Sequence, residues 1–104
     1  MNAARETRVN FDRINQAALV ALPALLRRWL PDGQQMGGEW VARNPRRADR
    51  SPGSFKINVR TGRWSDFATG DKGGDVISLA AYLAGLSQVE AAFELARALG
   101  IEPT

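Results

Sequence analysis

The residues of this chain that are best suited to chemistry are basic side chains gathered in its middle third. The segment Trp40 to Asp75 holds eight basic and four acidic residues, whereas Val76 to Thr104 holds one basic and three acidic residues. The candidate nucleic-acid-binding residues are Arg43, Arg46, Arg47, Arg50, Lys56, Arg60, Arg63, Trp64 and Lys72. Arginine and lysine neutralise backbone phosphates, so we expect binding whose affinity falls as salt rises. The alternative is an ordinary solvated surface.

Two features beside these cations allow both a functional and a structural interpretation. Trp64 follows Arg63 and could stack an unpaired base, although packing in the core is the simpler role for it. The glycine-rich segment 70–75 could offer backbone amides and Lys72 to a phosphate, or could be a turn in which Asp75 caps the next helix. This segment lacks the G-x-x-x-x-G-K-[ST] pattern of nucleotide-binding loops, so nucleotide hydrolysis is not indicated.

The composition removes most enzyme chemistry. The chain contains no cysteine and no histidine. Disulfides, thiolate and imidazole metal ligands, cysteine nucleophiles and a histidine general base are therefore absent. No other combination of nucleophile, base and metal ligand is visible, so we expect no catalytic residue, no cofactor, no bound metal and no enzymatic activity in this chain alone.

Length and hydropathy indicate one compact domain in the cytoplasm. The chain has 104 residues, of which 44% are hydrophobic, which suffices for a single modest core. No window approaches the roughly 18 consecutive apolar residues of a membrane helix, and the N-terminus is polar. We expect a flexible N-terminal segment over residues 1–10 and a single domain over residues 11–104.

Apolar periodicity predicts the helices that surround the basic segment. Spacings of three and four residues predict a helix over residues 11–30, with Pro23 kinking it or starting a second helix. Asp75 is placed to cap a helix over residues 75–84, and the Ser87 and Glu90 spacing of a capping box precedes a helix over residues 87–99.

The basic segment itself has the pattern of strands. Phe55, Ile57 and Val59 alternate with polar residues, as in a half-buried strand, and Thr61-Gly62 is typical of a hairpin turn. We predict strands over residues 39–43, 54–59 and 63–67 and no regular structure in 70–75. The expected fold class is α+β, with a small antiparallel three-stranded sheet flanked by N-terminal and C-terminal helices.

From Gly38 to Leu99, four short motifs occur in a characteristic order. They are Asn44-Pro45-Arg46-Arg47, Ser51-Pro52-Gly53-Ser54-Phe55, Asp66-Phe67-Ala68-Thr69-Gly70 and Gly74-Asp75. Their order resembles that of the zinc-ribbon N-terminal domain of bacterial and phage DNA primases, which carries Cys-Pro-x-His, Ser-Pro-Ser-Phe, Cys-Phe-x-Cys-Gly and Gly-Asp. The resemblance implies a degenerate, metal-free form of that domain.

By this resemblance, the four zinc-ligand positions are Asn44, Arg47, Asp66 and Thr69. Arginine cannot ligate zinc, and neutral amide and hydroxyl oxygens are poor substitutes for thiolate and imidazole. We expect an Asp66 to Arg47 ion pair across the former metal position. We also expect the lost metal to be replaced by packing of Trp40, Phe55, Trp64 and Phe67.

The resemblance implies a non-catalytic module that holds single-stranded or template DNA beside a separate primase or helicase domain. The source would be a phage, a plasmid or an integrated element. The alternative is a protein-interaction domain that lost DNA binding together with zinc and docks a helicase or polymerase subunit. In that case Glu90 and Glu94 of the last helix would matter more than the arginines.

Overall fold

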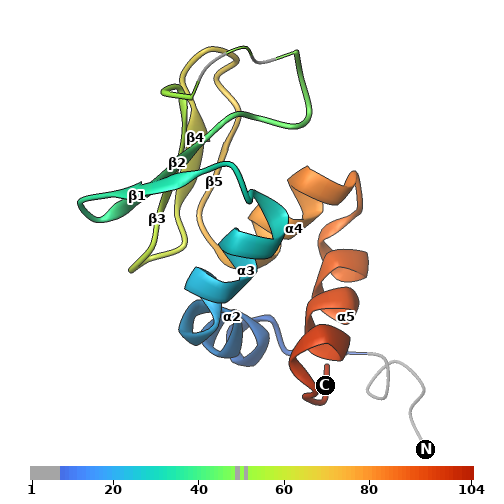
Figure 1. Ribbon diagram of the computed structural model, residues 1–104. Coiled ribbons are helices and arrows are strands. Elements are labelled where there is room, and N and C mark those ends of the chain that lie inside the picture. The colour runs from blue at the N-terminus through green and yellow to red at the C-terminus, as the bar shows by residue number, and fades with distance from the viewer. Residues whose placement is uncertain (1–7, 49, 51) are drawn as a thin grey trace, which may run out of the picture.

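The computed structural model describes residues 8–48, 50 and 52–104, and within them four helices pack beside one antiparallel sheet (Figure 1). Ser51 and residues 1–7 of the predicted N-terminal segment lie outside the described residues. The helices are α2 Phe11–Val20, α3 Leu22–Trp29, α4 Val76–Ala84 and α5 Gln88–Leu99. The α+β class predicted from the sequence is confirmed.

The sheet contains five strands in sequence order, so each strand pairs with its neighbour along the chain. The strands are β1 Gln34–Met36, β2 Glu39–Ala42, β3 Phe55–Asn58, β4 Trp64–Asp66 and β5 Lys72–Gly73. The three central strands match those predicted over residues 39–43, 54–59 and 63–67, and each is one or two residues shorter than predicted. In the central register, Ile57 of β3 lies opposite Trp40 of β2 and Trp64 of β4.

The prediction of only three strands was wrong, because two short strands extend the sheet at its edges. β1 joins β2 through Gly37-Gly38, where Gly37 has a φ of 64°. Its three residues are exposed, so it carries no apolar alternation. β5 lies in the glycine-rich segment 70–75, where we expected no regular structure, and pairs Lys72 with Ser65.

The helices lie on one side of the sheet, with α3 and α4 nearest to it, and form a single core with it (Figure 1). Phe55 and Ile57 of β3 are fully buried, as are Ile14 of α2 and Leu26 of α3. The expected break at Pro23 is present: α2 and α3 are separate helices, and Pro23 lies in the first turn of α3, where a proline is tolerated.

Local signals at the ends of the last two helices also match the sequence. The Asp75 side chain accepts the Ser78 N–H at 2.8 Å and caps α4. At α5, Ser87 and Glu90 form the reciprocal capping box. In the part of the chain that the structure describes, no single helix is long and apolar enough to span a membrane, and α4 with α5 reaches that length only as a pair bent by 105°.

Candidate nucleic-acid interface

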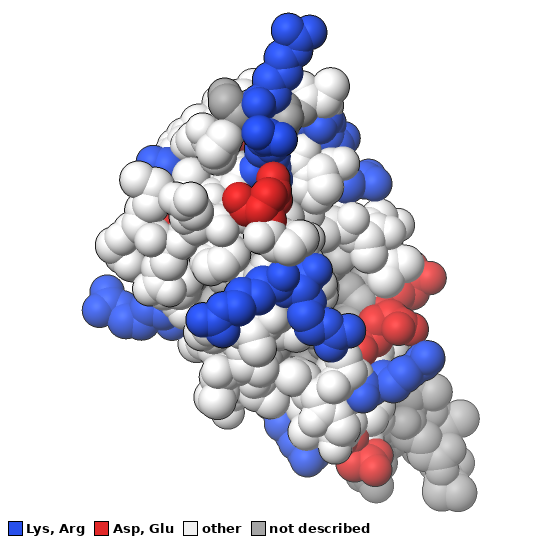
Figure 2. Space-filling model, viewed as in Figure 1, with Lys and Arg blue, Asp and Glu red and all other residues white. Residues whose placement is uncertain are grey.

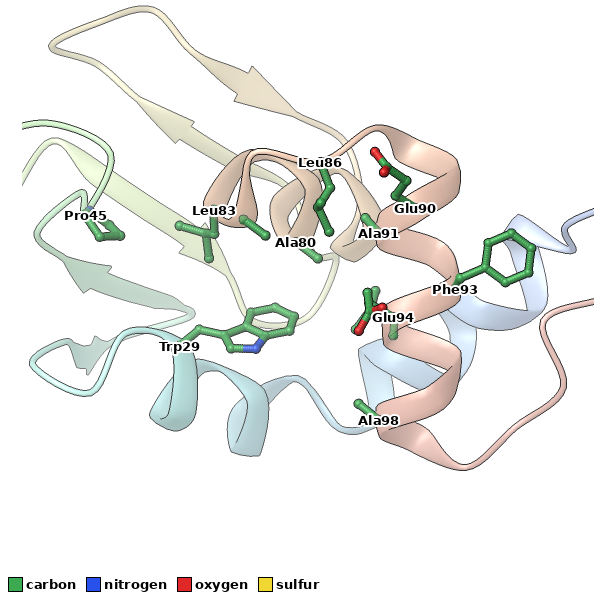
Figure 3. A pocket seen from close by; sticks show the side chains of 12 residues that line it. Trp29, Pro45, Ala80, Leu83, Leu86, Glu90, Ala91, Phe93, Glu94 and Ala98 are labelled. Atoms are coloured by element: carbon green, nitrogen blue, oxygen red, sulfur yellow. The ribbon is translucent and has the colours of Figure 1, made fainter.

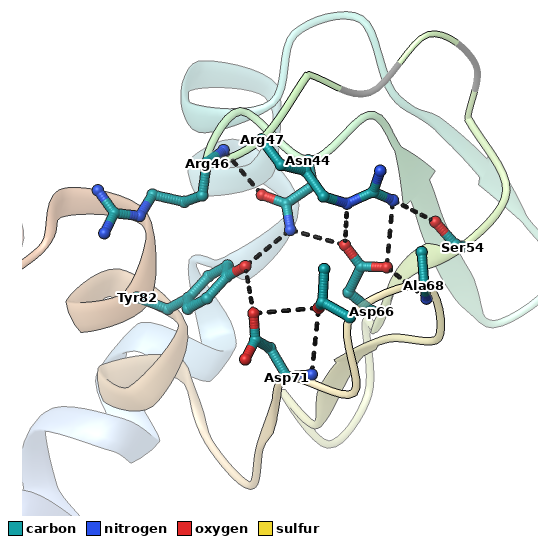
Figure 4. Close-up of polar contacts among 9 residues, drawn as sticks. Asn44, Arg46, Arg47, Ser54, Asp66, Ala68, Asp71 and Tyr82 are labelled. Carbon is teal, nitrogen blue, oxygen red and sulfur yellow. Dashed lines mark hydrogen bonds and ion pairs between the residues drawn. The ribbon is translucent and has the colours of Figure 1, made fainter.

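A buried cluster of polar side chains lies where the resemblance places a metal. The Asn44 Nδ2 donates to Asp66 Oδ2 at 2.7 Å, and the Arg47 Nε donates to the same oxygen at 2.8 Å (Figure 4). Arg47 Nη2 also donates to Asp66 Oδ1 at 3.2 Å and to Ser54 Oγ at 2.7 Å. The predicted ion pair between Asp66 and Arg47 is therefore present. It ties the loop after β2 to the end of β4.

Asp66 is the centre of this cluster. Its side chain is fully buried, and its Oδ1 accepts a further hydrogen bond from the Ala68 N–H at 2.9 Å. The hydrogen bond from Arg47 holds the pKa of Asp66 well below its usual range; burial opposes this effect, and the donors Asn44 and Ala68 add to it. A buried carboxylate with several donors remains ionised, so the cluster holds a fixed negative charge against the guanidinium.

The cluster continues onto α4 through a tyrosine. Tyr82 accepts the second Asn44 N–H bond at 2.8 Å and donates its hydroxyl proton to Asp71 Oδ2 at 2.9 Å (Figure 4). Burial raises the pKa of Tyr82, so the hydroxyl keeps that proton. Thr69 lies at the edge of this chain of contacts, where its Oγ1 donates to Asp71 at 3.0 Å. Tyr82 and Asp71 were not predicted as members of the cluster.

The opposite, uncovered face of the sheet carries three of the predicted cations. Strand register places Lys56 of β3 and Lys72 of β5 on either side of Ser65 in one cross-strand row. Since side chains alternate between faces, all three point away from the buried Trp64 and Ile57. Lys56, Lys72 and Arg63 line a shallow depression of about 590 Å³, whose lining contains one carboxylate, Glu39. This is the most concentrated part of the predicted site.

The remaining predicted basic residues do not join that depression. Arg43, Arg50 and Arg60 are exposed but do not line it. Arg47 belongs to the buried cluster. The guanidinium of Arg46 lies against Gly85 at the end of α4, where its Nη1 would be 3.3 Å from a Cβ placed on that glycine. Figure 2 shows Lys and Arg side chains spread from the loop end of the sheet down over the helices, so the cations form no single patch on that face.

The structure corrects the assignment of two aromatic residues. Trp64 is only 5% exposed, its ring lies 4.6 Å from that of Tyr82, and its Nε1 donates to Ser78 Oγ at 3.2 Å. This burial favours the structural interpretation of Trp64 over stacking on a base. Phe67 was expected in the core with Trp40 and Phe55, but it is 73% exposed. Phe67 lies just beyond Asp66, the last paired residue of β4.

Phe67 is instead a candidate contact residue that the sequence did not reveal. It follows Ser65 and Asp66 in the alternation and therefore projects toward the uncovered face. The Lys56 Nζ lies 5.9 Å from the centroid of its ring. An exposed aromatic ring beside a lysine is the combination that holds unpaired bases in single-strand-binding proteins.

Two backbone amides in the first turn of α4 already have acceptors, which favours the turn-and-cap interpretation of the glycine-rich segment. The Ser78 N–H is bound by Asp75, and the Ile77 N–H donates to Asn15 Oδ1 at 3.0 Å. The segment is a short strand followed by a helix cap, and Lys72 belongs to the strand. Among the described residues, no group of three or more Asp, Glu, His or Cys is placed to hold a metal ion.

Comparison with known proteins supports the fold. No protein-family model and no curated protein matches the chain. The crystal structure of the Aquifex aeolicus primase (zinc-binding and RNA polymerase domains) is similar over 91% of this chain, with a TM-score of 0.72 and 23% sequence identity. The chain corresponds to 22% of the length of that solved chain. The domain therefore has a primase-like fold, as the resemblance predicted.

Proposed function

We propose that this chain is a non-catalytic nucleic-acid-binding module that holds single-stranded or template DNA for a primase or primase-helicase. The observation that carries this proposal is the depression on the uncovered sheet face, which Lys56, Arg63 and Lys72 line. These cations come from β3, the hairpin turn and β5, so the fold brings together charges that lie apart in the sequence. Phosphate contacts of this kind provide affinity without sequence preference.

The buried cluster gives this surface its shape without taking part in contact. Asp66 and Arg47 tie the loop after β2 to β4, and β4 lies between the strands that carry Lys56 and Lys72. A site built on fixed strands places its cations more accurately than a free loop would. We therefore assign Arg47 and Trp64 to the framework, and we assign contact with nucleic acid to the cations of the uncovered face and to Phe67.

Catalysis belongs to another domain in this proposal. The solved primase carries zinc-binding and RNA polymerase domains together, and this chain corresponds to only part of its length. Within the described ranges, no three or more Asp, Glu, His or Cys residues are grouped so that they could hold a catalytic metal ion. We accordingly infer a cytoplasmic replication protein of a phage, plasmid or integrated element, in which this module positions the template.

Fluorescence anisotropy with a labelled oligo(dT) of about 16 nucleotides tests the proposal at about 50 mM and about 200 mM salt. Lys56→Glu and Lys72→Glu should each weaken binding by about tenfold, which corresponds to roughly 1.4 kcal/mol. Arg13→Glu is the matched control, because Arg13 is an exposed residue in the first turn of α2, where glutamate is well tolerated. It should leave the affinity unchanged.

Two results would contradict the proposal. One is the absence of binding by the unmodified chain at about 50 mM salt. The other is an equal loss of affinity in Arg13→Glu and Lys72→Glu, which would mean that only net charge matters. The first result would favour the alternative, a protein-docking domain of a replication complex, and the second would mean that the sheet face is not the specific contact surface.

A further inference from the structure

We propose that a groove between α3, α4 and α5 binds an amphipathic helical segment of a partner protein that carries basic residues one helical turn apart. This inference goes beyond nucleic-acid binding and does not depend on it. The groove and the depression on the sheet share no lining residue. The two surfaces can therefore be tested separately.

The groove is an open apolar channel on the helical half of the molecule. Trp29 at the end of α3 forms one wall, Leu83 of α4 and the following Leu86 form the floor, and α5 forms the other wall (Figure 3). Its volume is about 790 Å³. This lies within the range of about 300–1,000 Å³ that is typical of binding pockets.

The α5 wall contains two alanines, where another backbone can come close. Ala91 and Ala98 face the groove together with Leu95. Phe93 of the same helix also borders the groove and is 39% exposed, with its ring directed outward in Figure 3. An apolar channel of this size is unusual on the surface of a monomer and is typical of helix-in-groove recognition.

Two carboxylates border the groove on the α5 side. Glu90 and Glu94 are four residues apart, so they lie one turn apart on the same face of the helix. The Glu90 Oε1 accepts the Ser87 N–H at 2.9 Å, and this hydrogen bond lowers the pKa of Glu90 and fixes its carboxylate. Glu94 forms an exposed ion pair with Arg97 at 3.3 Å.

Charge complementarity identifies the occupant. The acidic border belongs to the segment Val76 to Thr104, which holds three acidic residues and one basic residue in a chain with a net charge of +3. Figure 2 shows acidic side chains over α5. Lysines or arginines one turn apart on a helix would match the spacing of Glu90 and Glu94. The apolar face of the same helix would fill the channel beside Trp29.

The test uses the complete chain, labelled with ¹⁵N, and two synthetic helical peptides of about 15 residues. Both peptides carry leucines on one face; one has two lysines one turn apart beside that face, and the other has glutamates at those positions. The indole N–H signal of Trp29 reports on the groove. The indoles of Trp40 and Trp64 are internal controls, because they donate to Leu30 O and Ser78 Oγ.

The lysine peptide should shift the Trp29 indole signal and bind about tenfold more tightly than the glutamate peptide. Glu94→Lys should weaken the lysine peptide by about fivefold, whereas Glu102→Lys, the same charge change at an exposed residue outside the groove, should not. Ala98→Trp, which fills the groove from an exposed position on α5, should abolish binding.

Three outcomes would overturn the proposal. The first is that neither peptide shifts the Trp29 indole signal. The second is that the two peptides bind equally well. The third is that light scattering detects a dimer and that the NMR signals of the groove change with protein concentration. The last outcome would make a second copy of this chain the occupant. Failure of the oligo(dT) titration would leave the groove proposal intact, because Glu94 and Ala98 lie outside the depression on the sheet.

Discussion

At the scale of single residues, a hydrogen-bonded cluster stands where the resemblance places a zinc ion. An amide, a guanidinium and a carboxylate meet at Asn44, Arg47 and Asp66 through hydrogen bonds of 2.7 to 3.2 Å. Among the described residues, no buried side-chain nitrogen or oxygen is left without a hydrogen-bond partner. Burial of the carboxylate is tolerated because the guanidinium compensates its charge. Removal of one partner would leave a buried, uncompensated charge and would lower the free energy of unfolding.

The sequence could predict part of this cluster. The ion pair between Asp66 and Arg47 followed from their positions in the motifs, because opposite charges replaced two ligands of one ion. Tyr82 could not be predicted, since it lies 38 residues from Asn44 and only the packing of α4 brings it near. Phe67 was assigned to the core by its type, although its position beyond the last paired residue of β4 leaves it in solvent.

Replacing Asp66 with asparagine should make the stability less dependent on pH. The folded-state pKa of Asp66 lies below its ordinary value of 3.8, so its contribution to stability is complete above that value and is lost as the pH falls towards the folded pKa. Urea unfolding should show Asp66→Asn about 3 kcal/mol less stable than the unmodified chain near pH 7. The difference should shrink below about pH 3. A constant difference at both pH values would contradict this role.

Replacing Phe67 with alanine should weaken single-strand binding without weakening the fold. Its ring is 73% exposed, so its removal leaves no cavity. Loss of one stacked base should reduce affinity for oligo(dT) by about 5- to 100-fold, and Phe67→Trp should retain it. Anisotropy titration measures the affinity, and thermal melting checks that stability is unchanged. Equal affinity of the alanine variant would remove Phe67 from the contact surface.

At the scale of elements, the central strands and the helices follow from local patterns, and the edge strands do not. Alternation of apolar residues defines β3, and side-chain caps define the starts of α4 and α5. β1 and β5 are two or three residues long and have little or no buried side, so their pairing depends on neighbouring strands that the sequence does not specify locally. The one local signal for β1 was Gly37-Gly38, a two-residue hairpin connection.

The position of β5 depends on the absence of a side chain at Gly73. A Cβ there would lie 1.9 Å from Ser78 Oγ and 2.3 Å from Trp64 Nε1. Gly73→Ala should therefore break the Trp64 hydrogen bond, change the near-ultraviolet circular dichroism and destabilise the chain by about 2 kcal/mol. Gly74→Ala is the matched control, because a Cβ on Gly74 meets nothing within 4 Å. Equal stability of the two variants would contradict this account of β5.

At the scale of the whole molecule, charge is divided between two surfaces. The cations Lys56, Arg63 and Lys72 surround the depression on the uncovered sheet face, and the carboxylates Glu90 and Glu94 border the groove on the helical half. Composition predicted the division of charge along the chain. The packing of β3, β4 and β5 brings only three of the predicted basic residues together around the depression. No local sequence pattern distinguishes these three from the other predicted basic residues.

The salt dependence of binding should report how many cations contact phosphates. With three phosphates neutralised on a single strand, the logarithm of affinity should fall with the logarithm of salt with a slope of about −2. Lys72→Ala should reduce the magnitude of that slope by about 0.7. Arg47 is not counted among the cations that contact phosphates, because it is bound to Asp66. A slope unchanged by Lys72→Ala would show that Lys72 does not contact the backbone.

The most direct test of the central claim is to map the contact surface of ¹⁵N-labelled protein by NMR during titration with oligo(dT). We predict that the largest shifts occur at Lys56, Ser65, Phe67 and Lys72 on the uncovered face, while the Trp29 indole in the groove does not move. Shifts confined to α4 and α5, or no shifts at a concentration of oligo(dT) that saturates anisotropy, would contradict the claim that this sheet face binds nucleic acid.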